Sequence, residues 1–254
     1  MRNIVAIAQK ELKSYFTSPI AYVVIGFFAL LYGFFYWVTL QYFMQRSMQM
    51  NLQPDTQGVN INDIMLRPLF SNAAVIVLFV LPMVTMRTYA EEKRSGTIEL
   101  LLTSPLTDVQ IIFGKFLGAL ALYTVMLSVS LAHVGILFYY GNPEWKPIVA
   151  GYLGLLLMGG CFLSLGLFIS SLTKNQIVAG IVTFAVALLF WIISWVSNFA
   201  TGIGELANYL SIIDHFDDFA KGVIDTTHLV YYQSFIGFGL YLTAKSVDSE
   251  RWRG

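Results

Sequence analysis

The chain has 254 residues, of which 57% are hydrophobic and only 12% are charged, and its formal net charge is zero. An ordinary soluble domain carries about twice that share of charged residues, so the composition excludes a water-soluble globular protein. The single cysteine excludes an intramolecular disulfide and any metal site built from several cysteines. We therefore expect an all-α integral membrane protein with a single domain, residues 1–254, that lies in the lipid bilayer and binds no nucleic acid.

Residues 1–19 predict an amphipathic helix on the membrane surface. Its apolar residues fall on one side of a helical wheel and its basic residues on the other, which suits a helix lying along the inner leaflet with its basic face toward anionic headgroups. Ser18 and Pro19 then turn the chain into the membrane. Glu11 projects from the middle of the apolar stripe, and two explanations stay open. Either its carboxylate reaches sideways to water, or this helix face is an interface where Glu11 pairs with a basic residue of another protein.

Six stretches without any Asp, Glu, Lys or Arg predict membrane-spanning helices, because each backbone amide must be satisfied within its own segment in lipid. The second is interrupted by Pro82, and the sixth is diluted by Gln233, Gly237 and Gly239. The predicted spans are residues 20–40, 69–86, 116–140, 148–169, 177–200 and 228–244.

The distribution of basic residues predicts the orientation of these spans. With the N-terminus in the cytoplasm, eleven of the fifteen Lys and Arg residues lie on the cytoplasmic side, and only Arg46, Arg67, Lys146 and Lys221 lie outside. Both termini are therefore expected in the cytoplasm. The outer segments are a polar loop at 41–68 and short surface helices within 201–227, which precede the sixth span.

The cytoplasmic loop at 87–115 is unlike a simple connection. A dense charge cluster is followed by the helix breaker Gly96, then by a short apolar helix that Pro105 ends. Thr107 and Asp108 are a plausible cap for the helix that leads into the third span. A short helix of this kind, lying across the cytoplasmic mouth, can dock into a groove of a soluble partner and transmit motion to the spans on either side.

The order of these residues resembles the first cytoplasmic loop of the ABC-2 family of ABC-transporter permeases. The N-terminal helix, the six spans and the outer helices match as well, and the run at 214–219 is most similar to the subfamily that includes gliding-motility-associated permeases. The matching loop residues are Glu91, Glu92, Lys93, Arg94, Gly96, Thr97, Glu99, Leu100, Leu101, Pro105, Gly114 and Lys115.

The resemblance implies a function for this loop. In the family it is the coupling helix that contacts the ATPase, with a smaller contact expected here at 170–176. The resemblance therefore assigns an ATPase-coupling interface to Glu91, Glu92, Lys93, Arg94, Gly96, Thr97, Glu99, Leu100, Leu101 and Pro105.

No glycine-rich phosphate loop of the Walker A type occurs in the sequence. We therefore expect that the chain is not an enzyme and has no cofactor of its own, and that ATP and Mg²⁺ bind to a separate ABC ATPase subunit. Because the family's pathway lies between two six-span halves, a second permease chain, identical or different, is a further expected partner. An extracytoplasmic accessory protein is another candidate partner, and the expected location is the inner membrane of a bacterium.

Three alternatives compete with this ATP-driven exporter. An ion-coupled secondary transporter usually carries ionisable groups near the membrane midplane, and His133 lies well inside a predicted span, where a packing role is the simpler explanation. A non-transporting subunit that transmits force within an ATPase complex would use the same coupling loop. An intramembrane hydrolase is disfavoured because the sequence contains neither a Gly-x-Ser-Gly elbow nor a His-Glu-x-x-His motif.

Overall fold

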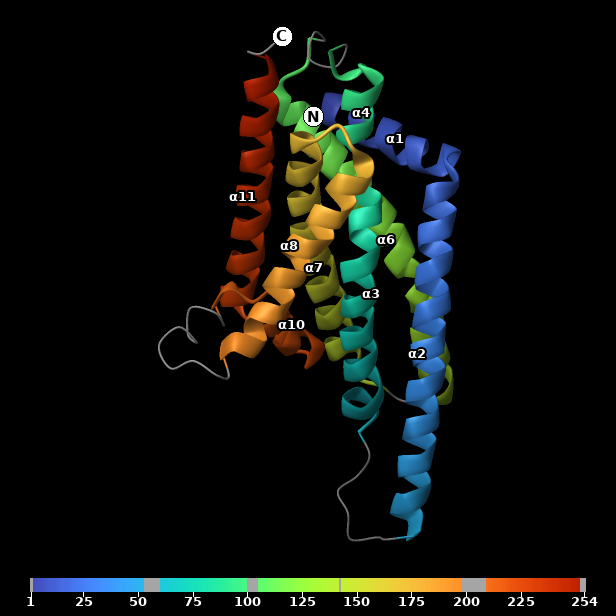
Figure 1. Ribbon diagram of the computed structural model, residues 1–254. Coiled ribbons are helices and arrows are strands. Elements are labelled where there is room, and N and C mark those ends of the chain that lie inside the picture. Colours follow the sequence, from blue (N-terminus) through green and yellow to red (C-terminus); the bar gives the residue numbers. More distant parts are fainter. Residues whose placement is uncertain (1, 53–59, 100–104, 142, 198–208, 252–254) are drawn as a thin grey trace.

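The computed structural model describes residues 2–52, 60–99, 105–141, 143–197 and 209–251, and within these ranges every regular element is a helix (Figure 1). The helices run lengthwise through one bundle, except for α1, α4 and α10, which lie at its two ends. We call the end with α1, α4 and both chain termini the α4 end, and the opposite end the α10 end. The elements are α1 (Arg2–Thr17), α2 (Pro19–Leu52), the π-helix η1 (Asn62–Leu66), α3 (Arg67–Thr85), α4 (Ala90–Ser95), α6 (Asp108–Tyr140), α7 (Trp145–Leu172), α8 (Gln176–Ser197), α10 (Ile212–Ala220) and α11 (Thr226–Arg251).

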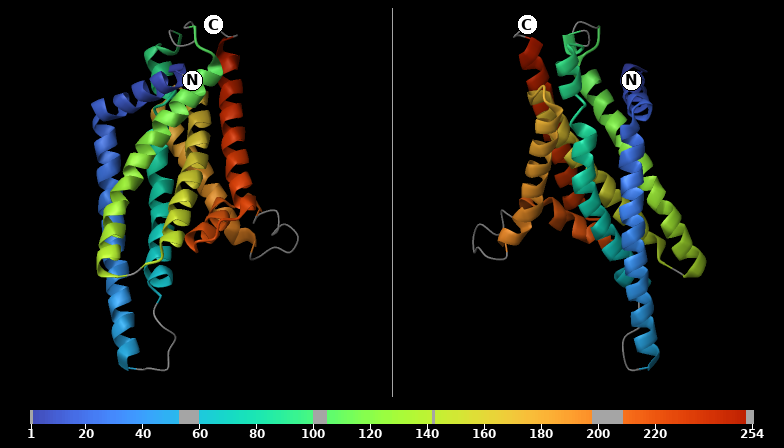
Figure 2. Two further views of the ribbon diagram at one scale, coloured as in Figure 1. Left: turned by 180° about the vertical axis from the view of Figure 1, so that it is seen from behind. Right: turned by 45° about the vertical axis from the view of Figure 1, so that its right-hand side comes forward.

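The predicted amphipathic helix is α1, and it lies crosswise over the α4 end of the bundle (Figure 2). Its apolar stripe packs against α6 instead of lipid, with Ile7 and Tyr15 buried. The chain bends at Ser18, as expected, and α2 begins at Pro19, a favourable residue for a first helical turn.

The polar loop predicted at 41–68 is wrong over most of its described part. Helix α2 continues to Leu52, and η1 and the start of α3 occupy 62–68. The reason is local: no Gly or Pro interrupts the chain between 34 and 53, and its Gln, Met and Arg residues favour helix. At 34 residues, α2 is about 51 Å long and exceeds a hydrocarbon core of about 30 Å, so its last turns project beyond the α10 end.

Five helical segments are long and apolar enough to cross a membrane by length and composition. They include α2, α3, α6, α7 and α8, which overlap the first five predicted spans. Helix α11 contains the sixth predicted span, 228–244, but polar residues such as His228 and Gln233 keep its mean hydropathy too low to qualify. The chain is therefore a multi-pass protein with five such helices in its described part, and the sixth span remains a prediction.

Helix α7 is the centre of the bundle and packs against α3, α6, α8, α10 and α11. Glycines make these contacts close: a Cβ at Gly159 would lie 2.2 Å from the Tyr123 ring of α6, and one at Gly166 would lie 2.1 Å from Thr85 of α3. Gly159 and Gly166 therefore allow close helix packing, and α7 continues through both positions without a break.

At the α10 end, two histidines join α10 to α11. His215 Nε2 lies 3.1 Å from the carbonyl oxygen of Tyr209, so this nitrogen carries a proton and Nδ1 is free to accept. His228 Nδ1 lies 2.6 Å from it, and His228 Nε2 lies 2.9 Å from the Asp218 carboxylate. A chain of polar contacts therefore runs from the Tyr209 carbonyl through both histidines to Asp218.

Replacing Gly159 with alanine should destabilise the fold, because the added methyl group would force the Tyr123 ring from its place. We expect a loss of about 1–3 kcal/mol in unfolding free energy, a typical cost of overpacking. The matched control is Gly135→Ala in α6, where a Cβ meets no atom within 4 Å. Thermal melting in detergent tests the pair, and equal melting temperatures for the two variants would contradict this packing role.

Acidification should weaken the junction between α10 and α11. Burial, reinforced by the neighbouring charge of His228, lowers the pKa of His215 below its ordinary 6.5 and outweighs the opposing effects of the Tyr209 carbonyl, Asp214 and Asp218. The unfolded chain therefore binds this proton at a higher pH than the folded one. The contribution of His215 to the free energy of unfolding is complete above about pH 6.5, and it is lost as the pH falls through the pKa of His215 in the folded state.

We expect a lower melting temperature at about pH 5 than at about pH 7.5. In His215→Phe, the ring can keep its stacking on Tyr231, at 3.9 Å between centroids, but cannot titrate, so the drop should be smaller. The same drop in the variant and the wild type would rule out His215 as its source.

Candidate functional site: a buried ion-pair cluster at the α4 end

Lys115 lies at the α4 end, in the second turn of α6, with only 1% of its side chain exposed. Its ammonium group donates to Glu11 of α1 at 2.9 Å, to Glu92 of α4 at 2.7 Å and to the carbonyl oxygen of Thr88 at 3.0 Å. An ammonium has three donors, so all of them are used. Lys115, Glu11 and Glu92 form what we call the ion-pair cluster, which joins three helices far apart in the sequence.

Helix α6 begins where the sequence predicts. Thr107 caps it by accepting from the backbone N–H of Gln110, and the Gln110 side chain accepts from the backbone N–H of Thr107, which completes a capping box. Gly114 and Gly118 then leave room for α1: a Cβ at either position would come within 2.6 Å of Ile7 or Glu11, respectively. This close approach is what brings the carboxylate of Glu11 to Lys115.

The cluster is well shielded and carries a net negative charge. The side chains of Glu11 and Glu92 are 12% and 17% exposed, and two carboxylates share one ammonium. The Tyr89 ring covers the ammonium at 5.0 Å, an attractive arrangement for a cation over an aromatic face. Glu92 Oε2 is buried and has no hydrogen-bond partner in the described part of the chain. Loss of the Lys115 ammonium would therefore leave two shielded carboxylates without a cation.

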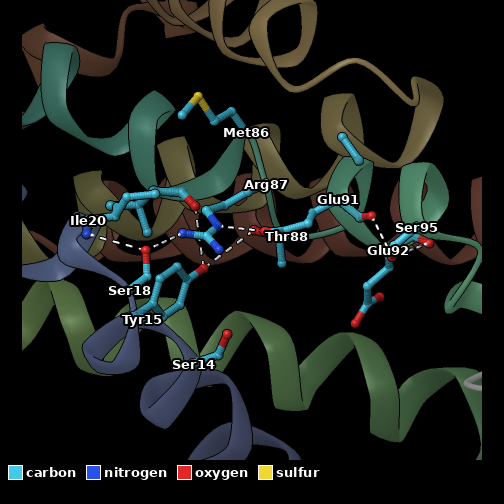
Figure 3. A network of polar contacts seen from close by, with 12 residues as sticks. Ser14, Tyr15, Ser18, Ile20, Met86, Arg87, Thr88, Glu91, Glu92 and Ser95 are labelled. Carbon is cyan, nitrogen blue, oxygen red and sulfur yellow. Dashed lines mark hydrogen bonds and ion pairs between the residues drawn. The ribbon is translucent and has the colours of Figure 1, made fainter.

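A second set of contacts ties the α3–α4 connection to the bend between α1 and α2 (Figure 3). Arg87 donates to Glu91 at 2.7 Å and to Ser18 at 3.0 Å. The Tyr15 hydroxyl lies 3.4 Å from the carbonyl oxygen of Val84, and burial raises the pKa of Tyr15, which keeps the phenol neutral. Tyr15, Arg87 and Glu91 line a cavity of about 300 Å³ between α1 and α4.

Helix α4 is also held from the side of α7 and α11. The Ser170 hydroxyl accepts the backbone N–H groups of Tyr89 and Ala90, both at 3.1 Å, and so satisfies amides at the start of α4. Lys93, 4% exposed, donates to the carbonyl oxygen of Ser171 and to the carboxylate of Glu250 on α11. Helix α4 is therefore connected by polar contacts to α6, α7 and α11, and through Lys115 to α1.

The predicted interface residues fall into three groups. Glu92 and Lys93 are turned inward to the contacts above, as is Glu11, whose basic partner is therefore within the same chain. Glu91 is half-exposed, and the exposed residues are Arg94, Gly96, Thr97, Glu99 and Pro105. Leu100 and Leu101 lie outside the described residues.

Gly96 ends α4 in a left-handed conformation, with φ at 72°, as its prediction as a helix breaker requires. The charge cluster before it is helical, and most of the apolar run after it, predicted as a short helix, lies outside the described residues. Lys115 matched a motif in the sequence without being predicted as a site residue, and Tyr89 and Ser170 were missed. A lysine close to a long apolar run was the available signal, because such a charge needs a partner.

Comparison with known proteins decides the family. The sequence pattern of ABC-2 family transporter proteins matches residues 5–246. The chain belongs to the ABC-2 family of transporter proteins. It is also 32% identical, over 154 residues, to a probable multidrug ABC transporter permease, YbhR, of Escherichia coli strain K12, and equally to that of strain O157:H7. The match covers 59% of this chain and 41% of the relative, so the chain spans less than half the length of that relative.

His133, which lies well inside the third predicted span, packs between α2 and α6. Its ring lies 5.4 Å from the Tyr32 ring and 4.9 Å from the Tyr36 ring, centroid to centroid. No group of three or more His, Cys, Asp or Glu side chains able to hold a metal occurs among the described residues. The contacts of His133 with Tyr32 and Tyr36 are those of a packing residue and give no support to ion coupling.

Lys115→Met should destabilise the permease by about 3–5 kcal/mol, because it leaves the buried carboxylates of Glu11 and Glu92 without a cation. The triple variant Glu11→Gln, Glu92→Gln, Lys115→Met removes all three charges and should recover most of the loss. Thermal melting in detergent measures both, with Lys13→Met, an exposed position of α1, as the control. Wild-type melting of Lys115→Met would show that the cluster does not hold these helices.

Proposed function

We propose that the chain is the membrane-embedded permease subunit of an ATP-driven ABC exporter. A separate nucleotide-binding subunit, which carries ATP and Mg²⁺, docks at the α4 end. Two permease chains, identical or different, form the pathway, and the complex lies in a bacterial inner membrane with both termini of this chain in the cytoplasm. Family membership supports the transport role, and the excess of Lys and Arg near the α4 end supports the orientation.

The coupling proposal rests on the contacts that fix α4 against the neighbouring helices. The exposed side of α4 includes Arg94, which has no ion pair within the described residues, while its inward side makes polar contacts with α6, α7 and α11. A partner that moves α4 therefore moves α1 and α6 through the ion-pair cluster and α7 and α11 through Lys93. Coupling requires such a contiguous set of contacts that both sites can bias.

The cargo is proposed from the relative and from the spans. The similar Escherichia coli protein is named a probable multidrug permease, and the predicted spans of this chain carry no Asp, Glu, Lys or Arg. Both features favour an amphipathic or lipidic cargo over a bare ion. A subunit that transmits force to an extracytoplasmic accessory protein, without transport, would use the same α4 contacts and is the second candidate function.

The test is affinity purification of the detergent-solubilised chain from its native host, followed by mass spectrometry. The wild type should recover an ATPase with a phosphate loop, and Arg94→Glu should reduce the recovery severalfold, because it reverses an exposed charge on α4. Lys13→Glu reverses an exposed charge on α1 and should leave recovery near the wild-type level. Failure of the wild type to recover an ATPase would sink the proposal and favour an ion-coupled transporter.

Recovery of the ATPase does not separate export from force transmission. Reconstituted complexes should show ATP-dependent movement of an amphipathic probe if the permease exports. ATP hydrolysis without movement of any probe would favour the second candidate.

A further inference from the structure

A cleft of about 520 Å³ lies at the α10 end, between α3, α8 and α10. Its volume is within the range of pockets that hold drug-sized molecules, about 300–1,000 Å³. The wall from α8 presents two indole rings, Trp191 and Trp195, and the wall from α3 presents the polar side chains of Ser71 and Asn72. Helix α10 supplies the charged wall with Asp214 and Asp217.

The two aspartates differ in what they already bind. Asp217 is paired with Arg67 at 2.9 Å and with Lys221 at 2.6 Å, so its charge is compensated. These cations outweigh the effect of burial and lower the pKa of Asp217. Asp214 is exposed, and its carboxylate has no hydrogen bond or ion pair within the described ranges. The cleft therefore keeps one uncompensated negative charge.

We propose that this cleft binds an organic ammonium group that carries an apolar or aromatic substituent. Asp214 supplies the counter-charge, the faces of Trp191 and Trp195 supply cation–π and apolar contact, and Asn72 and Ser71 bind polar parts of the ligand. A bare metal ion does not fit, because indole rings are not metal ligands and the described residues contain no metal-binding group of acidic or histidine side chains. An anion is repelled by Asp214.

A role of this cleft in the transport pathway rests on the proposed function. Binding of the ligand in the cleft does not. The ammonium can come from two sources: a lipid headgroup that enters from the surrounding membrane, or a soluble cationic compound. Both share the chemistry that the cleft recognises, and competition separates them.

The experiment is isothermal titration calorimetry of the full chain in dodecyl maltoside, a detergent without an ammonium group, with phenyltrimethylammonium as the probe. We expect saturable binding to the wild type. Asp214→Asn should weaken it about tenfold, since a charged partner is lost. Trp191→Leu should weaken it severalfold. Asp63→Asn, which removes another exposed carboxylate of this end outside the cleft, should bind like the wild type.

Two controls make the result decisive. Benzenesulfonate, an aromatic anion of similar size, should not bind. Displacement of the probe by phosphatidylethanolamine but not by phosphatidylglycerol would identify a lipid headgroup as the source, and displacement by neither would identify a soluble compound. The proposal is overturned if Asp214→Asn binds as tightly as the wild type, if the sulfonate binds equally well, or if no heat is released. These outcomes leave recovery of an ATPase at the α4 end unaffected, so the two proposals fail separately.

Discussion

The ammonium group of Lys115 has to find acceptors inside the protein, and the arrangement of the α4 end depends on that requirement. A charge buried to this extent costs several kcal/mol unless its partners replace water. The partners come from α4, a helix of only six residues, and from α1, whose apolar stripe already packs against α6. The cluster thereby turns two peripheral helices into part of the bundle, and it fixes the position of the segment proposed to meet the ATPase.

Close packing around α7 performs the corresponding task in the middle of the bundle. Where Gly159 and Gly166 face Tyr123 and Thr85, the backbone of α7 approaches its neighbours without side chains between them. In lipid, such contacts replace the hydrophobic driving force that holds soluble helices together. Contacts this tight deform little, so the displacement proposed at α4 would be passed along α3, α6 and α7 rather than absorbed. Continuous packing thus joins the α4 end to the α10 end.

The two ends use charge differently, and this difference underlies the proposed division of roles. At the α4 end, buried charges are engaged with one another and hold structure. At the α10 end, Asp217 and Asp218 are also engaged, but Asp214 stays open beside two tryptophans. Charges with a structural role are paired within the protein, whereas a binding site for a charged ligand keeps a charge unpaired until the ligand binds.

The sequence by itself determined the features that depend on neighbouring residues: an all-helical membrane protein, the amphipathic α1, the cap at Thr107 and the stop at Gly96. Hydropathy and backbone propensity act over a few residues, so they are readable in order along the chain. Only the tertiary structure decided that Glu11 and Glu92 meet at Lys115 and that Asp214 lines one cleft with Trp191, because the members of each pair lie on different helices and at least 23 positions apart. A charged residue in an apolar pattern indicates that it needs a partner, but which partner it has depends on how the helices pack.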